Sequence, residues 1–165
     1  MKKTITHTSE IESFSDLSEL SVEFQDLVNQ AKKALESSYS PYSGFGVGSA
    51  LKLSNGKVVL GSNQENIAYP SGLCAERVAI FSAGTNYPGT EIETIAIIAK
   101  SLHGDVAEPV TPCGSCRQVM IEVETNQTKP ITVIMAGSNG EVWVSKSVNN
   151  LIPFYFSSPV VGRAK

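Results

Sequence analysis

The sequence predicts one layered α/β domain built around a mixed sheet. Three observations lead to this prediction. Helix-type and strand-type hydrophobic patterns alternate along the chain, which is typical of an α/β domain. An Asn-Gly dipeptide stands between two β-rich segments, which is a strong signal for a β-hairpin. The chain has 165 residues, with no internal repeat or linker, and this length suits a single domain.

The first twenty residues differ from the rest in composition. They are polar and rich in Ser, Thr and Glu, and they contain no Gly or Pro. After the two lysines there is no apolar run of the length that a secretory signal needs. We therefore predict an N-terminal extension of unassigned role over residues 1–20 and the main domain over residues 21–165.

The first elements of the main domain are a helix and a hairpin. From Ser21, the segment SVEFQDLVNQAKKALESS places apolar residues three and four apart, which predicts an amphipathic helix. Pro41 follows shortly after its end. The segment GVGSALKLSNGKVVLGSNQEN then gives two β-rich runs on either side of Asn55-Gly56, and this dipeptide suits the positive φ angles of a tight turn.

Helices and strands alternate through the second half of the chain. A second helix is expected from near Cys74 to about Ala83, followed by the buried-strand pattern IETIAIIAK. A third helix is expected to start at Pro112, a residue that suits a first helical turn, and to lead into the strand ITVIMAG. Asn139-Gly140 then predicts a turn into the strand EVWVSK.

Charge and cysteine content limit the classes of function. The net charge of −3 and the acidic pI of about 5.4 provide no basic surface for nucleic acid or anionic lipid. No stretch approaches the roughly eighteen apolar residues of a membrane span. The three cysteines are an odd number, which excludes a complete disulfide framework, and a cytoplasmic protein is expected. In that compartment cysteines are more often buried, catalytic or metal-bound.

The spacing of the cysteines favours a metal site. Cys113 and Cys116 form a Cys-x-x-Cys pair in TPCGSCRQVM, a pattern that redox dithiols and structural zinc sites share. Cys74 lies at another predicted helix start, where the helix dipole favours a thiolate. Three thiolates around Zn²⁺ leave one tetrahedral position open, which is typical of a catalytic site.

Two charged residues follow Cys74 within one helical turn. Glu76 could carry a proton from a water beside the open metal position to another atom. Arg77 could donate hydrogen bonds to the thiolates and so restore part of the Lewis acidity that three anionic sulfurs remove. A solvated helix face with a weak salt bridge would also accommodate both residues, and only the nearby cysteines favour the functional interpretation.

At this point the sequence resembles a family. The order Cys74-Ala75-Glu76, then Pro112-Cys113-Gly114-Ser115-Cys116, is similar to the zinc motif of nucleobase deaminases. The segments SPYSGFGVGSAL, NQENIAYPSGLCAER and PCGSCRQVM, and the C-terminal LIPFYF, resemble those of the cytidine deaminases that act on free nucleosides and form homotetramers. The resemblance covers about residues 21–158. It implies a three-layer α/β/α sandwich with a mixed five-stranded sheet.

The resemblance implies a role for each residue of the motif. Cys74, Cys113 and Cys116 would bind one Zn²⁺ per chain, and Glu76 would shuttle protons during the hydrolytic deamination of cytidine or deoxycytidine to uridine or deoxyuridine and ammonia. Backbone groups near Ala75 and Cys113 would bind the base edge. The product would enter pyrimidine salvage.

Further residues that match the family would bind the substrate. Asn63 and Glu65 correspond to the residues that hold the ribose hydroxyls, and an amide beside a carboxylate suits that task. Phe45 corresponds to an aromatic residue beside the pyrimidine. Phe156 corresponds to an aromatic residue that reaches the site of a neighbouring subunit, and Tyr69 to a residue of that shared wall. Each of these aromatic residues could instead belong to the core or to an interface.

Several other functions fit part of the sequence. A deaminase of the same fold could act on a modified nucleoside such as blasticidin S. Deaminases of polynucleotides share the zinc motif but need a basic channel or stacking surface, and this chain is acidic. A structural zinc domain would need His7 or His103 as a fourth ligand, and both histidines stand in polar segments, where we expect surface residues. A redox dithiol would leave Cys74 and Glu76 unexplained.

Overall fold

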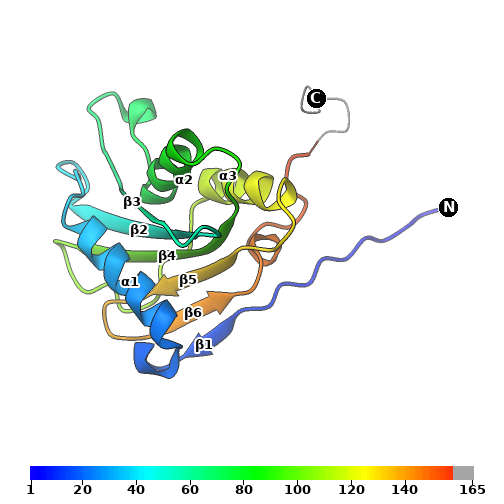
Figure 1. Cartoon of the computed structure of the whole chain (residues 1–165), viewed down its shortest axis with the longest axis horizontal. Helices are drawn as coiled ribbons and strands as arrows, with labels where there is room; N and C mark the ends of the chain where they lie inside the picture. Colours follow the sequence, from blue (N-terminus) through cyan, green and yellow to red (C-terminus); the bar gives the residue numbers. More distant parts are fainter. Residues whose placement is uncertain (158–165) are drawn as a thin grey trace.

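The protein is a three-layer α/β/α sandwich in the computed structural model, which describes residues 1–157. Helix α1 covers one face of the central sheet, and α2 and α3 cover the other (Figure 1). The elements are β1 (Glu12–Phe14), η1 (Leu17–Glu19), α1 (Val22–Leu35), β2 (Phe45–Leu53), β3 (Val58–Ser62), η2 (Tyr69–Ser71), α2 (Ala75–Asn86), β4 (Ile92–Ser101), α3 (Gly114–Thr125), β5 (Thr132–Ala136), β6 (Val142–Ser145) and η3 (Val148–Leu151). The layered fold predicted from the sequence is confirmed.

The sheet of the described residues has six strands, in the order β1-β6-β5-β4-β2-β3, so the predicted number of five was wrong. The sixth strand, β1, comes from the N-terminal extension and pairs antiparallel with β6, with Ser13 opposite Trp143. Phe14 and Leu17 pack on the core beneath α1, and Leu20 is buried there. Part of the extension is therefore attached to the sheet, and three residues are too few to show a strand pattern in the sequence.

Both Asn-Gly turns form hairpins. Strands β2 and β3 pair antiparallel, and Gly56 has a φ of 78°. Strands β5 and β6 also pair antiparallel, and Gly140 has a φ of 100°. In contrast, β4 and β5 are parallel and α3 lies between them in the sequence, because a parallel pair requires a crossover connection. The sheet is therefore mixed.

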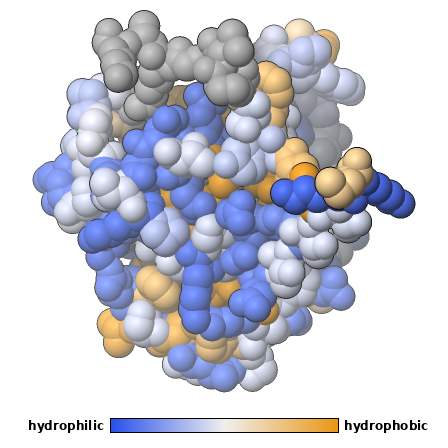
Figure 2. Space-filling view, turned by 90° about the vertical axis from the view of Figure 1, so that its right-hand side faces the viewer, coloured by the Kyte–Doolittle hydropathy of each residue, from blue (hydrophilic) through white to orange (hydrophobic). Residues whose placement is uncertain are grey.

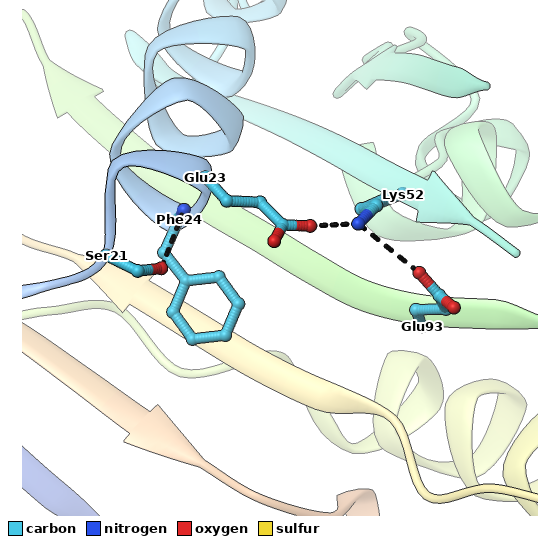
Figure 3. Close-up of polar contacts among 5 residues, drawn as sticks. All are labelled: Ser21, Glu23, Phe24, Lys52 and Glu93. Carbon is cyan, nitrogen blue, oxygen red and sulfur yellow. Dashed lines mark hydrogen bonds and ion pairs between the residues drawn. The ribbon is translucent and has the colours of Figure 1, made fainter. Parts of the chain in front are cut away.

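Helix α1 begins where the sequence predicts. Ser21 is its N-cap and accepts a hydrogen bond from the backbone N–H of Phe24 at 3.4 Å (Figure 3). Lys52 on β2 forms ion pairs with Glu23 on the helix and, at 3.4 Å, with Glu93 on β4 (Figure 3). Partly exposed ion pairs of this kind contribute little to stability. The packing of α1 on the sheet therefore depends mainly on its apolar face, made of Leu27, Val28, Ala31 and Ala34.

Helices α2 and α3 both begin directly after a cysteine. Cys74 is the N-cap of α2 and Cys113 the N-cap of α3, so α3 starts two residues later than the predicted Pro112. Gly61 lets β3 approach α2 closely, because an added Cβ would lie 2.4 Å from the carbonyl oxygen of Ala75. The first turn of α2 therefore rests directly on the backbone of the sheet.

One face of the surface is dominated by polar side chains. On the face shown in Figure 2, hydrophilic residues predominate and hydrophobic residues form small scattered patches. Over residues 1–157, no helix combines the length and hydrophobicity that crossing a bilayer would require.

Candidate active site and metal centre

Three cysteine side chains converge at the N-terminal ends of α2 and α3. The Sγ atom of Cys113 lies 3.7 Å from that of Cys74 and 3.5 Å from that of Cys116. All three sulfur atoms lie within 4.8 Å of one another. These separations are too long for a disulfide bond, which needs about 2.05 Å, and the cysteines are free. The structure thus brings together the three cysteines that the sequence singled out.

The three sulfur atoms fit a zinc ion. A tetrahedral ion with Zn–S bonds of about 2.3 Å places its sulfur ligands about 3.8 Å apart, close to the observed Sγ–Sγ separations of 3.7 and 3.5 Å. Within residues 1–157 this is the only group of three or more His, Cys, Asp or Glu side chains placed to hold a metal ion. Neither His7 nor His103 belongs to it. Three protein ligands leave one position of a tetrahedral ion for a reacting molecule.

The environment of the thiols already favours one thiolate. Hydrogen bonding by the Cys116 thiol and by Arg77 lowers the pKa of Cys74 to about 5. The Nη2 atom of Arg77 lies 3.6 Å from the Cys74 Sγ atom. The pKa of Cys116 is raised, first because its proton is donated to Cys74 and then because the side chain is buried. Ionising both thiols therefore calls for a cation.

Glu76 lies in the first turn of α2 with only 4% of its surface exposed. Burial is the largest cause that raises the pKa of its carboxyl group, and the nearby charge of Cys74 adds to the effect. A raised pKa makes a carboxyl group hold a proton more readily than an exposed one, which is the direction of shift that suits a general acid and base. The position and the electrostatics of Glu76 both suit proton transfer.

A cavity of about 640 Å³ opens beside the thiols and Glu76. A volume of this size suits a small organic ligand. Its wall includes seven residues that the sequence analysis selected, namely Phe45, Asn63, Glu65, Tyr69, Cys74, Glu76 and Cys113.

Four of the selected residues do not line this cavity. Ala75 is fully buried at the start of α2. Cys116 is buried and Arg77 half-buried, and neither contributes to the wall. Phe156 has 76% of its surface exposed, and its backbone N–H and C=O both bond to the side chain of Gln118 at 3.0 Å. In a single chain, Phe156 therefore does not line the cavity.

The side chain of Asn63 is largely engaged by the protein itself. Its Oδ1 atom accepts hydrogen bonds from the backbone N–H of Val47 at 2.7 Å and from the Ser38 hydroxyl at 2.6 Å. Its Nδ2 atom donates to the carbonyl oxygen of Phe45 at 2.9 Å. An amide has two acceptor lone pairs and two N–H donors, so one N–H remains for a ligand.

Glu65 is engaged in a similar way by the loop before β2. It accepts hydrogen bonds from the backbone N–H of Tyr42 at 2.9 Å, the backbone N–H of Ser43 at 3.2 Å and the Ser43 hydroxyl at 2.5 Å. The hydroxyl bond is the largest cause that lowers the pKa of Glu65. Glu65 is therefore an ionised acceptor at neutral pH, and of its roughly four acceptor positions one remains.

Sequence reasoning missed several residues that shape the site. Arg117 donates hydrogen bonds to the Pro112 carbonyl at 2.7 Å, the Leu151 carbonyl at 2.8 Å and the Thr111 hydroxyl at 2.8 Å. It thereby fixes the segment that leads into Cys113. Its place directly after Cys116, together with the rigid fork of its guanidinium group, was the available signal. Ser43 was missed too, although it belongs to a segment that carries the family resemblance.

Comparisons with known proteins identify the relatives of this chain. Residues 22–132 match the family model described as the cytidine and deoxycytidylate deaminase zinc-binding region. A curated cytidine deaminase of Halalkalibacterium halodurans is 39% identical over 134 residues, which are 81% of this chain and 94% of that protein. One of Sporosarcina psychrophila is 37% identical over 137 residues, or 82% and 93% of the two chains.

A solved structure of a cytidine deaminase is also similar to this chain. The crystal structure of cytidine deaminase from Burkholderia pseudomallei is 40% identical, with a TM-score of 0.70, and the match covers 83% of this chain and all of that one. The sequence match, the shared fold and the three-cysteine centre agree. The chain therefore belongs to the cytidine and deoxycytidylate deaminase family.

Proposed function

We propose that this enzyme is a zinc-dependent cytidine deaminase that converts cytidine and deoxycytidine to uridine and deoxyuridine with release of ammonia. The observation that carries the proposal is the buried Glu76 carboxyl group in the wall of the cavity that the three-thiol centre adjoins. The two curated relatives are named cytidine deaminases, which supports cytidine as the substrate.

Cys74, Cys113 and Cys116 would hold the zinc ion, which when bound supplies Lewis acidity that activates water near neutral pH. Glu76 takes a proton from the attacking water and delivers it to ring nitrogen 3 while oxygen adds to carbon 4. It then carries the second proton to the amino group, and the bond between carbon 4 and that nitrogen breaks. Water and cytidine thus give uridine and ammonia.

The remaining selected residues orient the nucleoside. Phe45 provides a flat apolar surface for the pyrimidine, and backbone groups beside Ala75 and Cys113 bond the base edge. One sugar hydroxyl can accept the remaining N–H of Asn63 and donate to the remaining acceptor position of Glu65. Because ribose and 2′-deoxyribose both carry such a hydroxyl, both nucleosides are substrates in this proposal.

The proposal extends to the domain boundaries, the oligomeric state and the compartment of the enzyme. Residues 21–165 form the catalytic domain, and the extension has no proposed role in the chemistry. The exposed positions of Tyr69 and Phe156 fit a homotetramer in which both complete a shared wall between subunits. Three free thiols suit a reducing cytoplasm, where the reaction would serve pyrimidine salvage.

The test is the loss of cytidine absorbance with wild type, Glu76→Gln and the control Glu122→Gln, which changes an exposed glutamate of α3. We expect Glu76→Gln to keep one zinc per chain and to lose at least about 10³-fold in kcat, while the control stays within about twofold. If all three proteins hold zinc but none converts cytidine or deoxycytidine, the proposed substrate is wrong, and blasticidin S becomes the next substrate to assay. Absence of zinc from purified wild type would refute the mechanism.

A further inference from the structure

The backbone of Phe45 is held on both sides by polar side chains of the cavity wall. Its N–H donates to the Ser43 hydroxyl oxygen at 3.0 Å. Its carbonyl oxygen accepts from Nδ2 of Asn63 at 2.9 Å. The residue that would pack on the base is therefore anchored by the segment that would bind the sugar.

The direction of the hydrogen bonds through Ser43 is fixed by chemistry. A serine hydroxyl has one hydrogen to donate and lone pairs to accept with. An ionised carboxylate can only accept, so the hydroxyl hydrogen goes to Glu65 and the lone pair receives the Phe45 N–H. A bond to a charged acceptor is stronger than a neutral one, and each bond in such a chain polarises the next.

The loop conformation makes this chain of bonds possible. Gly44 has a φ of 63°, a left-handed conformation that glycine adopts at no steric cost. An added Cβ at this position would also lie 2.8 Å from Nε2 of His103. The turn brings the Ser43 side chain back onto the N–H of Phe45, where β2 begins.

We propose that Ser43 is a positioning residue that couples the sugar-binding carboxylate of Glu65 to the base-packing side chain of Phe45. This inference rests on the proposed function, because it assigns sugar to Glu65 and base to Phe45. Ser43, Glu65 and Phe45 all line the cavity, so the one hydroxyl that orients the carboxylate facing the sugar also supports the backbone of the residue that would pack on the base. Loss of the Ser43 hydroxyl weakens binding of the nucleoside and leaves the proton-transfer chemistry of Glu76 unchanged.

The first experiment compares Ser43→Ala with a matched control, Ser15→Ala. The Ser15 hydroxyl and N–H both donate to Glu19, the same pattern outside the cavity. We expect Ser43→Ala to raise KM for cytidine about tenfold, as for one charge-assisted bond, with kcat within about twofold. Ser43→Thr, which keeps the hydroxyl, should restore KM, and Ser15→Ala should leave it unchanged. A loss confined to kcat would overturn the proposal.

The second experiment tests whether Ser43 acts through Phe45. In a Phe45→Leu background, Ser43→Ala should raise KM by only about twofold, because the ring that it positions is gone. Equal effects in both backgrounds would overturn the coupling. Hydrogen exchange of the Phe45 amide provides a readout that needs no turnover, and it should be about tenfold faster in Ser43→Ala and unchanged in Ser15→Ala. If wild type does not convert cytidine, the proposed function fails, and an unchanged exchange rate would separately refute the Ser43 link.

Discussion

The close contact between β3 and α2 at Gly61 holds the first turn of α2 in place. We therefore expect a substitution at Gly61 to disturb the candidate active site. An added Cβ at Gly61 would lie 2.4 Å from the carbonyl oxygen of Ala75, 2.6 Å from the amide nitrogen of Ala79 and 2.9 Å from the Ala79 Cβ. Two of these atoms belong to the backbone, which cannot rotate away. Gly61→Ala therefore has to displace the first turn of α2, which carries Glu76 and follows Cys74.

A second glycine provides the matched control. At Gly48 an added Cβ would lie 2.1 Å from the carbonyl oxygen of Ala31 and 2.6 Å from the amide nitrogen of Leu35. Both contacts are with α1, on the opposite face of the sheet. Gly48→Ala therefore crowds the fold to a similar degree without displacing a helix of the site.

Overpacking of this kind costs about 1–3 kcal/mol, and backbone contacts belong at the upper end. For a chain of this length, 3 kcal/mol lowers Tm by about 6–12 °C. We expect both variants to show this loss in thermal unfolding followed by circular dichroism. Assayed well below Tm, Gly61→Ala should lose zinc affinity and at least about tenfold in kcat, while Gly48→Ala should keep both. Equal catalytic losses in the two variants, or full activity of Gly61→Ala, would refute this explanation.

Two further predictions concern the thiols and the extension. In metal-free protein the pKa of Cys74 is lowered to about 5, so this thiol is already ionised at neutral pH. Its alkylation rate, followed by peptide mapping, should therefore be nearly constant from about pH 6.5 to 8.5. A tenfold rise in that rate per pH unit would contradict the thiolate assignment. Deleting residues 1–11 should leave the free energy of unfolding within about 0.5 kcal/mol, since most of them are exposed. Deleting residues 1–20 removes β1 and the contacts of Phe14 and Leu20, and it should lower the free energy of unfolding, measured in urea, by about 2–4 kcal/mol. Equal stability of the two truncated proteins would show that β1 does not contribute to stability.

Elements with a strong local signal could be predicted from the sequence. Asn55-Gly56 and Asn139-Gly140 specify turns through their own φ preferences, and both hairpins form. The start of α3 was less predictable, because Pro112 and Cys113 both suit the beginning of a helix. The structure makes Cys113 the N-cap, with extended φ and ψ of −66° and 165°, and its thiol joins the cysteine cluster instead of capping the helix.

Features that depend on a distant partner could not be predicted. The strand β1 exists because β6 offers an unpaired edge, and nothing within residues 12–14 indicates this pairing. Asn63 and Glu65 were recognised as polar residues suited to hydroxyl groups. Their residue types could not show that Ser38 and the segment from Tyr42 to Val47 use most of their hydrogen-bonding capacity, because that depends on how the chain returns to them.

The first turn of α2 separates two acids that are only two residues apart. Cys74 gains hydrogen-bond donors from Cys116 and Arg77, so the pKa of its thiol falls, whereas Glu76 loses water, so the pKa of its carboxyl group rises. Opposite shifts in neighbouring groups fit the proposed roles of anionic ligand for Cys74 and proton carrier for Glu76. Because both shifts arise from packing and hydrogen bonds of the protein alone, the fold itself separates the acidities of the groups that we propose as metal ligand and proton carrier, before either metal or substrate binds.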